Sequence, residues 1–557
     1  QTWTWSGWVK RSKLGTAQSL FGTIFYSAPT NNQGYIRIEA DDKLHYVGYT
    51  GSGYDVQLIT TQVFRDASAW YHIVVQFDTT NATSSDRVKF YVNGSRITSF
   101  STATYPAQNY SGWLNGNSGS GVQLGIGRVT PYNNSEYFDG YLTEINFIDG
   151  QALTPSSFGE TDAVTGVWKP KKYTGTYGTN GFYLNFSDNS GTTSTTLGKD
   201  SSGNGNNWTP NNFSVTAGAG NDSMIDTPTP YADGGNGRGN YAVISPIDGN
   251  QYGGNVFTLS NGNLSATGIN ASANRTATIN LPTGKWYMEF TVGTISAPTT
   301  NLTWFGAQDV NGFTGNGTGY NNSGAIVFNG TSTSGYATFT TNDIIGCAFD
   351  ISANTATYYK NGTQIATGTL GVSAKTYTVW MQLNSNGDTF DANFGQRAFA
   401  YTPPSGYLAL NTQNLPDPTI KKPGTYFNTV LYTGDGASSR SITGVGFQPD
   451  FVWLKRRSGA GDHSQYDALR GATKLLQSSQ TGAEQTLTNG LTSFDTDGFG
   501  VGTYENASSV TYVGWNWKES ATPGFDIVTF TGNASARTIS HSLGVAPSMM
   551  ILKNRDT

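Results

Sequence analysis

The chain has 557 residues, of which 13% are aromatic and only 12% charged, and its net charge is −5. About 25% charged residues is typical, and nucleic-acid binding needs Lys and Arg to neutralise phosphates, so this composition argues against that function. The aromatic content excludes a disordered chain. The sequence has no run of 18 apolar residues, so no membrane insertion is predicted. Abundant Gly, Asn, Ser, Thr and aromatic residues favour strands and turns. The length predicts three to four domains, and we expect an all-β, multidomain chain of β-sandwiches.

The first predicted domain covers residues 1–158. Asn93-Gly94 is a strong signal for a two-residue hairpin turn between two of its short alternating segments. Many short strands separated by such turns are typical of a sandwich. The predicted strands are Thr2–Lys10, Tyr35–Glu39, Tyr71–Phe77, Val88–Val92, Val122–Ile126 and Gly140–Asp149.

Four segments of this domain carry a family resemblance: WTWSGWVK at 3–10, WYHIVVQFD at 70–78, VKFYVNGSRI at 88–97 and FDGYLTEINFIDGQAL at 138–153. In this order they resemble the laminin-G and concanavalin A-like jelly roll. The resemblance implies the fold and says little about the ligand.

Residues 159–240 are rich in Gly, Asn, Ser and Thr, and this composition predicts loops and an extended connector partly packed on the first domain. Phe182–Phe186 is expected to add a strand, and Trp208 and Phe213 to dock on the first domain. The phrase DSSGNGNNW at 200–208 is similar to stretches that trail jelly rolls in phage-like structural proteins.

The third predicted region, residues 241–412, contains KWYMEFTV at 285–292, DIIGCAFD at 343–350, TYYKNG at 357–362, FDANFG at 390–395 and PPSGY at 403–407. This order resembles a SPRY (B30.2-like) domain, which implies a sandwich that serves as an interaction module. Asn361-Gly362 predicts another hairpin turn.

The last region contains an internal repeat. Thr433-Gly434 recurs as Thr531-Gly532, and Lys455 recurs as Lys553, both at a spacing of 98 residues. We therefore expect one β unit at 421–524, including a strand within 511–520, and the start of a second unit at 525–557 that is cut off.

Catalytic signals are weak. Glycoside hydrolysis needs two carboxylates roughly 5–10 Å apart, and the nearest pairs are Glu144 with Asp149 and Asp495 with Asp497. A regular strand would put the first pair on opposite faces, and the second pair lies in a Gly-rich turn. Cys347 reads as a small buried residue and His72 as a strand histidine with a structural partner. We therefore expect no enzyme.

Binding residues are also predicted, as candidates only. Trp304, Tyr320 and Tyr336 lie in Gly/Asn-rich stretches, which makes them candidates for exposed rings that stack on sugars. Laminin-G-like jelly rolls often hold Ca²⁺ at the rim, so Asp41, Asp42, Asp55 and Asp139 are candidate ligands of a Ca²⁺ ion. For the aspartates the role of turn former is favoured over the metal role, and for the aromatic residues core packing is favoured over stacking.

The combination of jelly roll, connector, SPRY-like domain and repeated β units resembles virion appendage proteins of marine, cyanophage-type tailed phages. That resemblance implies a tail fibre or capsid-surface fibre on the virion surface, assembled in the host cytoplasm. The implied partners are other virion proteins and host cell-surface polysaccharide, and the implied state is a homo-oligomer, a trimer for a fibre. Three alternatives stay open: a bacterial secreted lectin-like adhesin, a polysaccharide depolymerase, and a purely structural capsid decoration protein.

Overall fold

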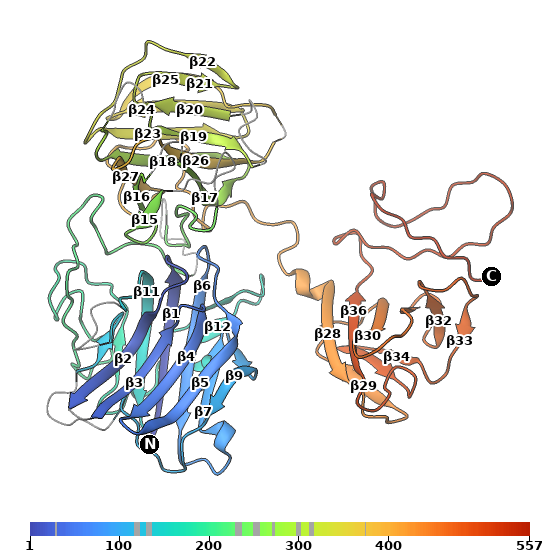
Figure 1. The fold of residues 1–557 in the computed structure, drawn as a ribbon. Helices are drawn as coiled ribbons and strands as arrows, with labels where there is room; N and C mark the ends of the chain where they lie inside the picture. The colour runs from blue at the N-terminus through green and yellow to red at the C-terminus, as the bar shows by residue number, and fades with distance from the viewer. Residues whose placement is uncertain are drawn as a thin grey trace. The chain divides into compact units, whose positions relative to one another are not determined.

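The computed structural model describes residues 1–27, 30–115, 123–129, 136–228, 237–248, 257–269, 273–296, 302–310, 317–373 and 375–556. The fold is all-β, as predicted, and the helical residues in the described ranges form short 3-10 turns. The chain divides into two compact units, one of residues 1–160 with 168–416 and one of 161–167 with 417–557 (Figure 1). Within the described ranges, no helix has the length and apolarity needed to cross a bilayer.

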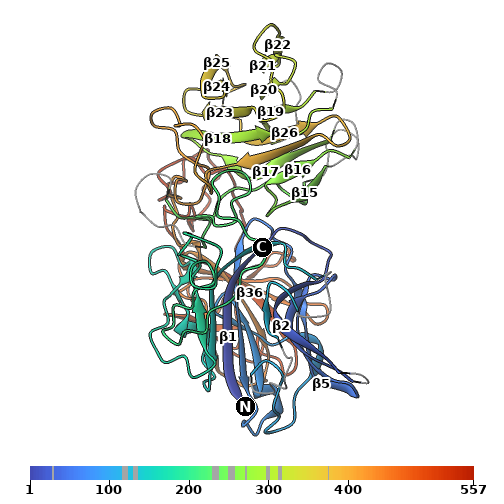
Figure 2. The same ribbon diagram turned by 90° about the vertical axis from the view of Figure 1, so that its left-hand side faces the viewer.

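The first unit begins with a two-sheet sandwich, whose sheets face each other in Figures 1 and 2. Its first sheet has the order β14 (Phe182–Leu184), β11 (Gly140–Asp149), β1 (Thr2–Arg11), β6 (Trp70–Asp78), β7 (Val88–Val92) and β8 (Ser95–Ile97). Its second sheet has the order β10 (Gly125–Ile126), β2 (Gln18–Ser27), β3 (Thr30–Ile38), β4 (Lys43–Thr50), β5 (Gly53–Val63) and β9 (Phe100–Thr104). The short elements η1 (Ser84–Asp86), η2 (Pro155–Ser157), β12 (Gly159–Thr161) and β13 (Trp168–Pro170) lie outside the two sheets.

Alternation along β1 explains this core. Trp3, Trp5 and Val9 point into the sandwich and are fully buried there, because successive side chains of a strand point to opposite faces. The predicted strands at 2–10, 88–92 and 140–149 are confirmed within one residue. Asn93 and Gly94 have φ of 48° and 82°, so the predicted hairpin turn is confirmed. Val122, where another predicted strand was to begin, lies outside the described residues.

The connector is held to the first sandwich by polar contacts as well as by packing. β14 pairs with β11, as expected, and Trp208 packs against Phe182 with ring centroids 4.8 Å apart. Phe213 is exposed, so its predicted docking is wrong. The Asp200 carboxylate accepts hydrogen bonds from the backbone N–H groups of Tyr183 at 2.9 Å and Ser202 at 2.8 Å, which fixes the turn that the sequence predicted as a loop.

The second sandwich of this unit has a seven-stranded and a six-stranded sheet, seen at the top of Figure 1. The first has the order β15 (Thr258–Ser260), β16 (Ser265–Thr267), β27 (Thr389–Asn393), β18 (Lys285–Val292), β23 (Ile344–Asp350), β24 (Thr355–Lys360) and β25 (Thr363–Thr369). The second has the order β17 (Ala273–Leu281), β26 (Tyr377–Leu383), β19 (Trp304–Asp309), β20 (Gly317–Asn321), β21 (Ile326–Phe328) and β22 (Thr331–Thr333). The predicted turn at Asn361-Gly362 is confirmed, with φ of 49° and 77°.

The two sandwiches of this unit share a buried junction. The Lys10 ammonium is fully buried and lies 2.9 Å from an Asp226 carboxylate oxygen, and it donates to the Tyr241 carbonyl at 2.8 Å. The other Asp226 oxygen accepts from the Trp70 indole at 3.1 Å. Burial raises the pKa of Asp226 and lowers that of Lys10, while each partner opposes the shift of the other. A buried pair with all its hydrogen bonds made fixes orientation more than it adds stability.

The second unit contains a six-stranded and a three-stranded sheet. The larger has the order β28 (Phe427–Thr433), β36 (Thr511–Trp517), β30 (Phe451–Arg456), β31 (Ser464–Asp467), β32 (Lys474–Gln477) and β33 (Gln485–Thr486). The smaller has the order β29 (Arg440–Thr443), β35 (Gly498–Val501) and β34 (Leu491–Asp495), and η3 (Pro423–Thr425) precedes β28. Over 525–556 the described chain forms no strand and folds back along the unit, ending at an Arg555–Glu484 ion pair of 2.8 Å.

Candidate binding site

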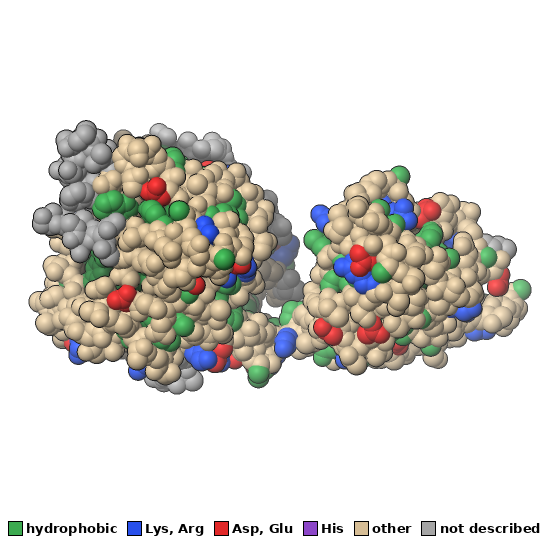
Figure 3. Space-filling model, turned by 90° about the horizontal axis from the view of Figure 1, so that it is seen from below, with side chains coloured by type: hydrophobic (Ala, Val, Ile, Leu, Met, Phe, Trp, Pro, Cys, Tyr) green, Lys and Arg blue, Asp and Glu red, His purple; other side chains and the backbone are tan. Residues whose placement is uncertain are grey.

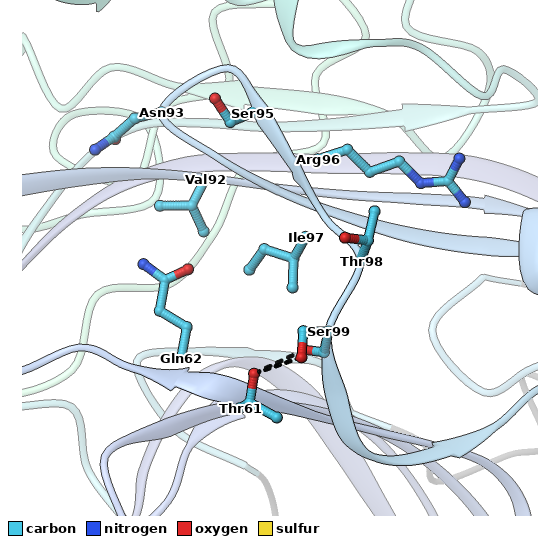
Figure 4. Close-up of a pocket in the computed structure, with 9 residues that line it drawn as sticks. All are labelled: Thr61, Gln62, Val92, Asn93, Ser95, Arg96, Ile97, Thr98 and Ser99. Carbon is cyan, nitrogen blue, oxygen red and sulfur yellow. Dashed lines mark hydrogen bonds between the residues drawn. The ribbon is translucent and has the colours of Figure 1, made fainter. Parts of the chain in front are cut away.

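A pocket of about 350 Å³ lies at one edge of the first sandwich. There β8 ends the first sheet, and β5 and β9 end the second (Figure 4). The volume lies within the roughly 300–1,000 Å³ of small-molecule sites. The lining residues come from the end of β5, the β7–β8 hairpin and the link to β9: Thr61, Gln62, Val92, Asn93, Ser95, Arg96, Ile97, Thr98 and Ser99.

The pocket has an apolar floor and a polar rim. Val92 and Ile97 are buried, whereas Gln62, Asn93 and Ser95 are exposed. The Ile97 side chain points into the space above β5 (Figure 4), and a hydrogen bond of 2.9 Å between the Thr61 and Ser99 hydroxyls closes one side. This mixture of hydroxyl and amide groups around a small apolar surface suits an uncharged polyhydroxylated ligand.

Asn93 links the pocket to the fold of the sheet. Its side-chain carbonyl accepts a hydrogen bond of 2.8 Å from the His72 backbone N–H, which leaves the NH₂ group as its remaining donor. Arg96 is the only charged residue among the nine that line the pocket, and it bonds the Asp86 carboxylate at 3.1 Å. Hydrogen bonding to Lys89 first, and to Arg96 as well, lowers the pKa of Asp86. The charge of Arg96 is already paired with Asp86, and no carboxylate lines the pocket. The pocket therefore offers no acid–base pair.

A smaller hollow of about 190 Å³ lies on the second sandwich, over β17, β19 and β26. It is lined by Asp248, Asn274, Thr276, Asn280, Gln308, Val310 and Thr378. Asp248 accepts hydrogen bonds from the Thr276 backbone N–H at 3.1 Å and from its hydroxyl, so this carboxylate braces the irregular register of β17. The volume of this hollow falls below the range of ordinary ligand sites.

The predicted aromatic platforms are not brought together as one surface. Tyr320 lies in β20 with 0% of its surface exposed and donates its hydroxyl to the Ala337 carbonyl, so its ring packs in the core, the role favoured from sequence, and is not a stacking platform. The Gly/Asn-rich flanks signalled a loop, but the strand places the ring in the core. Trp304 is half-buried and stacks on Trp380 with centroids 6.4 Å apart, and Tyr336 is half-buried against the same core. Neither lines either hollow.

The four predicted Ca²⁺ ligands have other partners. Asp42 is buried and bonds Arg11 at 3.0 Å and Arg65 at 2.8 Å, so its charge is already neutralised. Asp41 pairs with Lys43 at 3.2 Å, and Asp55 accepts from the Tyr110 hydroxyl at 3.3 Å. Burial raises the pKa of Asp139, which disfavours the charged form that a metal needs. In the described ranges, no three His, Cys, Asp or Glu residues are grouped to hold a metal ion, and the four aspartates are not brought together.

His72 is held by a ring stack and two hydrogen bonds on the outer face of the first sheet. Its Nδ1 accepts from the Trp168 indole at 2.9 Å, and its Nε2 lies 2.9 Å from the Ser6 hydroxyl. An indole N–H only donates a hydrogen bond, so Nδ1 is the acceptor and the ring proton is on Nε2. Nε2 therefore cannot accept a proton from the Ser6 hydroxyl. Burial lowers the pKa of His72 to about 3, and it raises that of the buried Cys347 thiol. Neither group is therefore set up as a catalytic base or nucleophile.

The carboxylates of the two predicted pairs are placed by the local backbone. Glu144 and Asp149 are five residues apart on β11, roughly 16 Å at about 3.3 Å per residue, which is too far for the roughly 5–10 Å that hydrolysis needs. Glu144 sits at a bulge with φ of 53°, so the regular alternation of faces is interrupted there. Asp497 is used locally, accepting from the Gly444 N–H at 3.1 Å and the Gly446 N–H at 2.6 Å.

The pocket residues were not among the predicted site residues. Thr61 and Ile97 lie 36 positions apart in the sequence, and only the meeting of two sheet edges brings them together. The Asn93-Gly94 turn was the one signal in the sequence, since it predicts where a polar hairpin tip projects at the edge of a sheet.

Two family models match parts of the chain. Residues 1–157 match the concanavalin A-like lectin/glucanases superfamily, and residues 422–557 match a domain of unknown function, DUF7483. The first match confirms the concanavalin A-like resemblance of the first domain. This lectin-like family points to carbohydrate or protein binding as the coarse function of that domain.

A curated relative and several solved structures are similar over shorter parts. The Ran-binding proteins 9/10 homolog of Drosophila melanogaster is 39% identical over 64 residues, which are 12% of this chain and 6% of that protein. The chain thus spans a small part of that relative.

The structure of the SPRY domain of human HERC1 is 20% identical and covers 27% of this chain and 96% of that chain, with a TM-score of 0.23. The stonustoxin structure is 16% identical and covers 28% of this chain and 27% of that chain, with a TM-score of 0.22. The TRIM65 PSpry domain is 12% identical and covers 28% of this chain and 92% of that chain, with a TM-score of 0.22.

Proposed function

We propose that this protein is a virion attachment protein, a tail fibre or capsid-surface fibre, whose concanavalin A-like domain binds host cell-surface glycans. The observation that carries the binding part is the pocket between β8 and β5, with its hydroxyl and amide rim and apolar floor. Hydroxyl and amide groups exchange hydrogen bonds with sugar hydroxyls, and Val92 and Ile97 offer a contact for the apolar face of a ring.

The surface composition supports the same proposal. On the face drawn in Figure 3, charged side chains are few and scattered, and some lie beside a side chain of opposite charge. Such a surface suits weak binding to neutral polysaccharide, which many copies on one particle multiply. The place on a virion, the homo-oligomer and the assembly with other virion proteins all rest on the sequence resemblance alone.

Replacement of Gln62 by Ala tests the pocket. We expect Gln62→Ala to weaken binding of the purified protein to envelope polysaccharide of the host at least 5-fold by biolayer interferometry, because a rim donor and acceptor are lost. Gln108→Ala is the matched control, since Gln108 is also an exposed glutamine and does not line the pocket. Equal binding by both variants would contradict this site.

The same preparation distinguishes the alternative functions. Release of reducing ends from the polysaccharide would favour a depolymerase, and absence of binding to glycan-bearing cells would favour a decoration protein. Mass measurement tests the oligomer, and a stable monomer would count against a fibre.

A further inference from the structure

The smaller hollow, of about 190 Å³, lies beside a break in the pairing of β17 with β26. These two strands and β19 lie side by side in one sheet of the second sandwich (Figure 2). Between Thr276 and Asn280, β17 bulges away from β26, and Ala277 forms a bridge with Ile244 instead. Bulges are frequent beside functional sites, because they interrupt pairing and re-aim side chains.

Thr378 of β26 lines this hollow with a hydroxyl that lacks a hydrogen-bond partner. Its neighbours Tyr377 and Val379 pack in the core, so Thr378 points to the outer face of the sheet. It is nonetheless only 3% exposed, and none of the described residues bonds its hydroxyl. A buried hydroxyl without a partner is destabilising, and valine would fill the same space without this cost. The hydroxyl therefore indicates a group that enters the hollow and bonds to it.

Amide and carboxylate groups surround the Thr378 hydroxyl. Asn280 of β17 and Gln308 of β19 lie opposite Thr378 on its two sides. Both line the hollow, and Gln308 is 7% exposed whereas Asn280 is exposed. Asp248 uses its Oδ2 to accept from the Thr276 N–H and hydroxyl, which leaves Oδ1 as an acceptor. The hollow thus presents donors and acceptors on both sides of one buried hydroxyl.

Size and charge select one class of occupant. A cavity of roughly 150 Å³ holds one benzene ring, so about 190 Å³ suits one substituted six-membered ring and is too small for a chain of rings. Of the described residues that line the hollow, Val310 is the only apolar one and none is basic, while the Asp248 carboxylate repels anions. An uncharged sugar ring fits these groups, because its hydroxyls both donate and accept hydrogen bonds.

We propose that this hollow is a second sugar site, which binds one neutral pyranose unit of a glycan. The Thr378 hydroxyl and the Gln308 amide would bond ring hydroxyls, and Asp248 Oδ1 would accept from another. The second site rests on the proposed function for its class of ligand, but it shares no lining residue with the first pocket. Two weak sites on one chain strengthen attachment where a single glycan reaches both.

Saturation-transfer NMR of the purified full chain with methyl α-glucoside, methyl α-galactoside and methyl α-mannoside tests this site. We expect at least one glycoside to bind, and Thr378→Val to weaken that binding roughly 5-fold or more, because a hydrogen bond to the sugar is lost. Thr303→Val is the matched control and should leave binding unchanged. Thr303 is 0% exposed, its hydroxyl also lacks a partner among the described residues, and it does not line the hollow.

Gln62→Ala separates the two sugar sites. Glycoside binding should persist in Gln62→Ala and should weaken when Thr378→Val is added. Loss of all glycoside binding in Gln62→Ala alone would overturn the second site and leave the first pocket standing. Binding that responds to Thr378→Val and not to Gln62→Ala would support the hollow and contradict the first pocket.

Thermal unfolding separates a binding role of Thr378 from a structural one. Thr378→Val should not lower the unfolding midpoint, since it removes a buried hydroxyl without a protein partner. Gln308→Leu keeps most of the side-chain volume and should also weaken glycoside binding roughly 5-fold. Three results would overturn the second site: no binding of any of the three glycosides, equal binding by Thr378→Val and Thr303→Val, or a lowered midpoint in Thr378→Val alone.

Discussion

β28 and residues 525–531 share the pattern Phe-x-x-Val-x-x-Thr, yet one is a strand with buried alternate residues and the other is largely exposed chain. Both copies make the same short-range arginine contact to a threonine carbonyl. The difference is that β28 pairs with β36 along its length and buries Val430 and Tyr432 in the core of the unit. Local sequence thus sets the course of the chain, and a strand forms only where neighbours supply hydrogen bonds and burial.

The largest expected contrast between the copies is at Leu454 and Leu552. Leu454→Ala should lower the free energy of unfolding of the second unit by about 3 kcal/mol, because it leaves a cavity in a closed core. Leu552→Ala should change it by less than about 0.5 kcal/mol, since that side chain is exposed. Denaturant dependence of hydrogen exchange at the amides of 427–517 measures both. Equal effects would mean that residues 549–553 already belong to the core.

The next contrast is at Gly434 and Gly532, which occupy equivalent positions. A Cβ at Gly434 would overlap the Ala507 carbonyl oxygen, whereas nothing lies within 4 Å of one at Gly532. Gly434→Ala should therefore destabilise the unit by about 2 kcal/mol through overpacking, and Gly532→Ala should be neutral. Thermal unfolding followed by near-UV circular dichroism checks this pair. If Gly434→Ala left thermal unfolding unchanged, the close approach of Gly434 to the Ala507 carbonyl would be contradicted.

The smallest expected effect is a pH dependence of stability at the contact between Glu519 and Asp526, where the two copies of the repeat meet. Burial, followed by a hydrogen bond to Asp526, raises the pKa of Glu519 to about 7. Since the folded pKa lies above the ordinary 4.5, this contact stabilises the fold below pH 4.5 and is lost as the pH rises through about 7. Carbon-detected NMR titration of Glu519 should show this midpoint.

Two replacements at this contact sharpen the titration. Asp526→Asn should lower the Glu519 midpoint while leaving it above 4.5, because burial is the largest cause of the shift. Glu519→Gln should remove the pH dependence of the contact. A Glu519 midpoint near 4.5 in the unaltered chain would contradict the contact.

Much of the fold followed from sequence because its signals are local. The all-β class, the strands at 88–92, 140–149 and 285–292, and the turns at Asn93-Gly94 and Asn361-Gly362 were predictable from alternation and from residues that tolerate positive φ. The site was not predictable in this way. Tyr320 has a loop-like neighbourhood in sequence but a buried place in β20, and the pocket joins residues from two sheet edges.

The sequence by itself determined the strand pattern, the turns and the 98-residue repeat, because each depends on residues close in the chain. The tertiary structure alone decided which of two similar segments became a strand, and that the Asp42 carboxylate lies between two arginines. It also decided where Thr61 meets Ile97. The physical reason is that burial and inter-strand hydrogen bonds are made with partners distant in the chain, whose arrival no local pattern encodes.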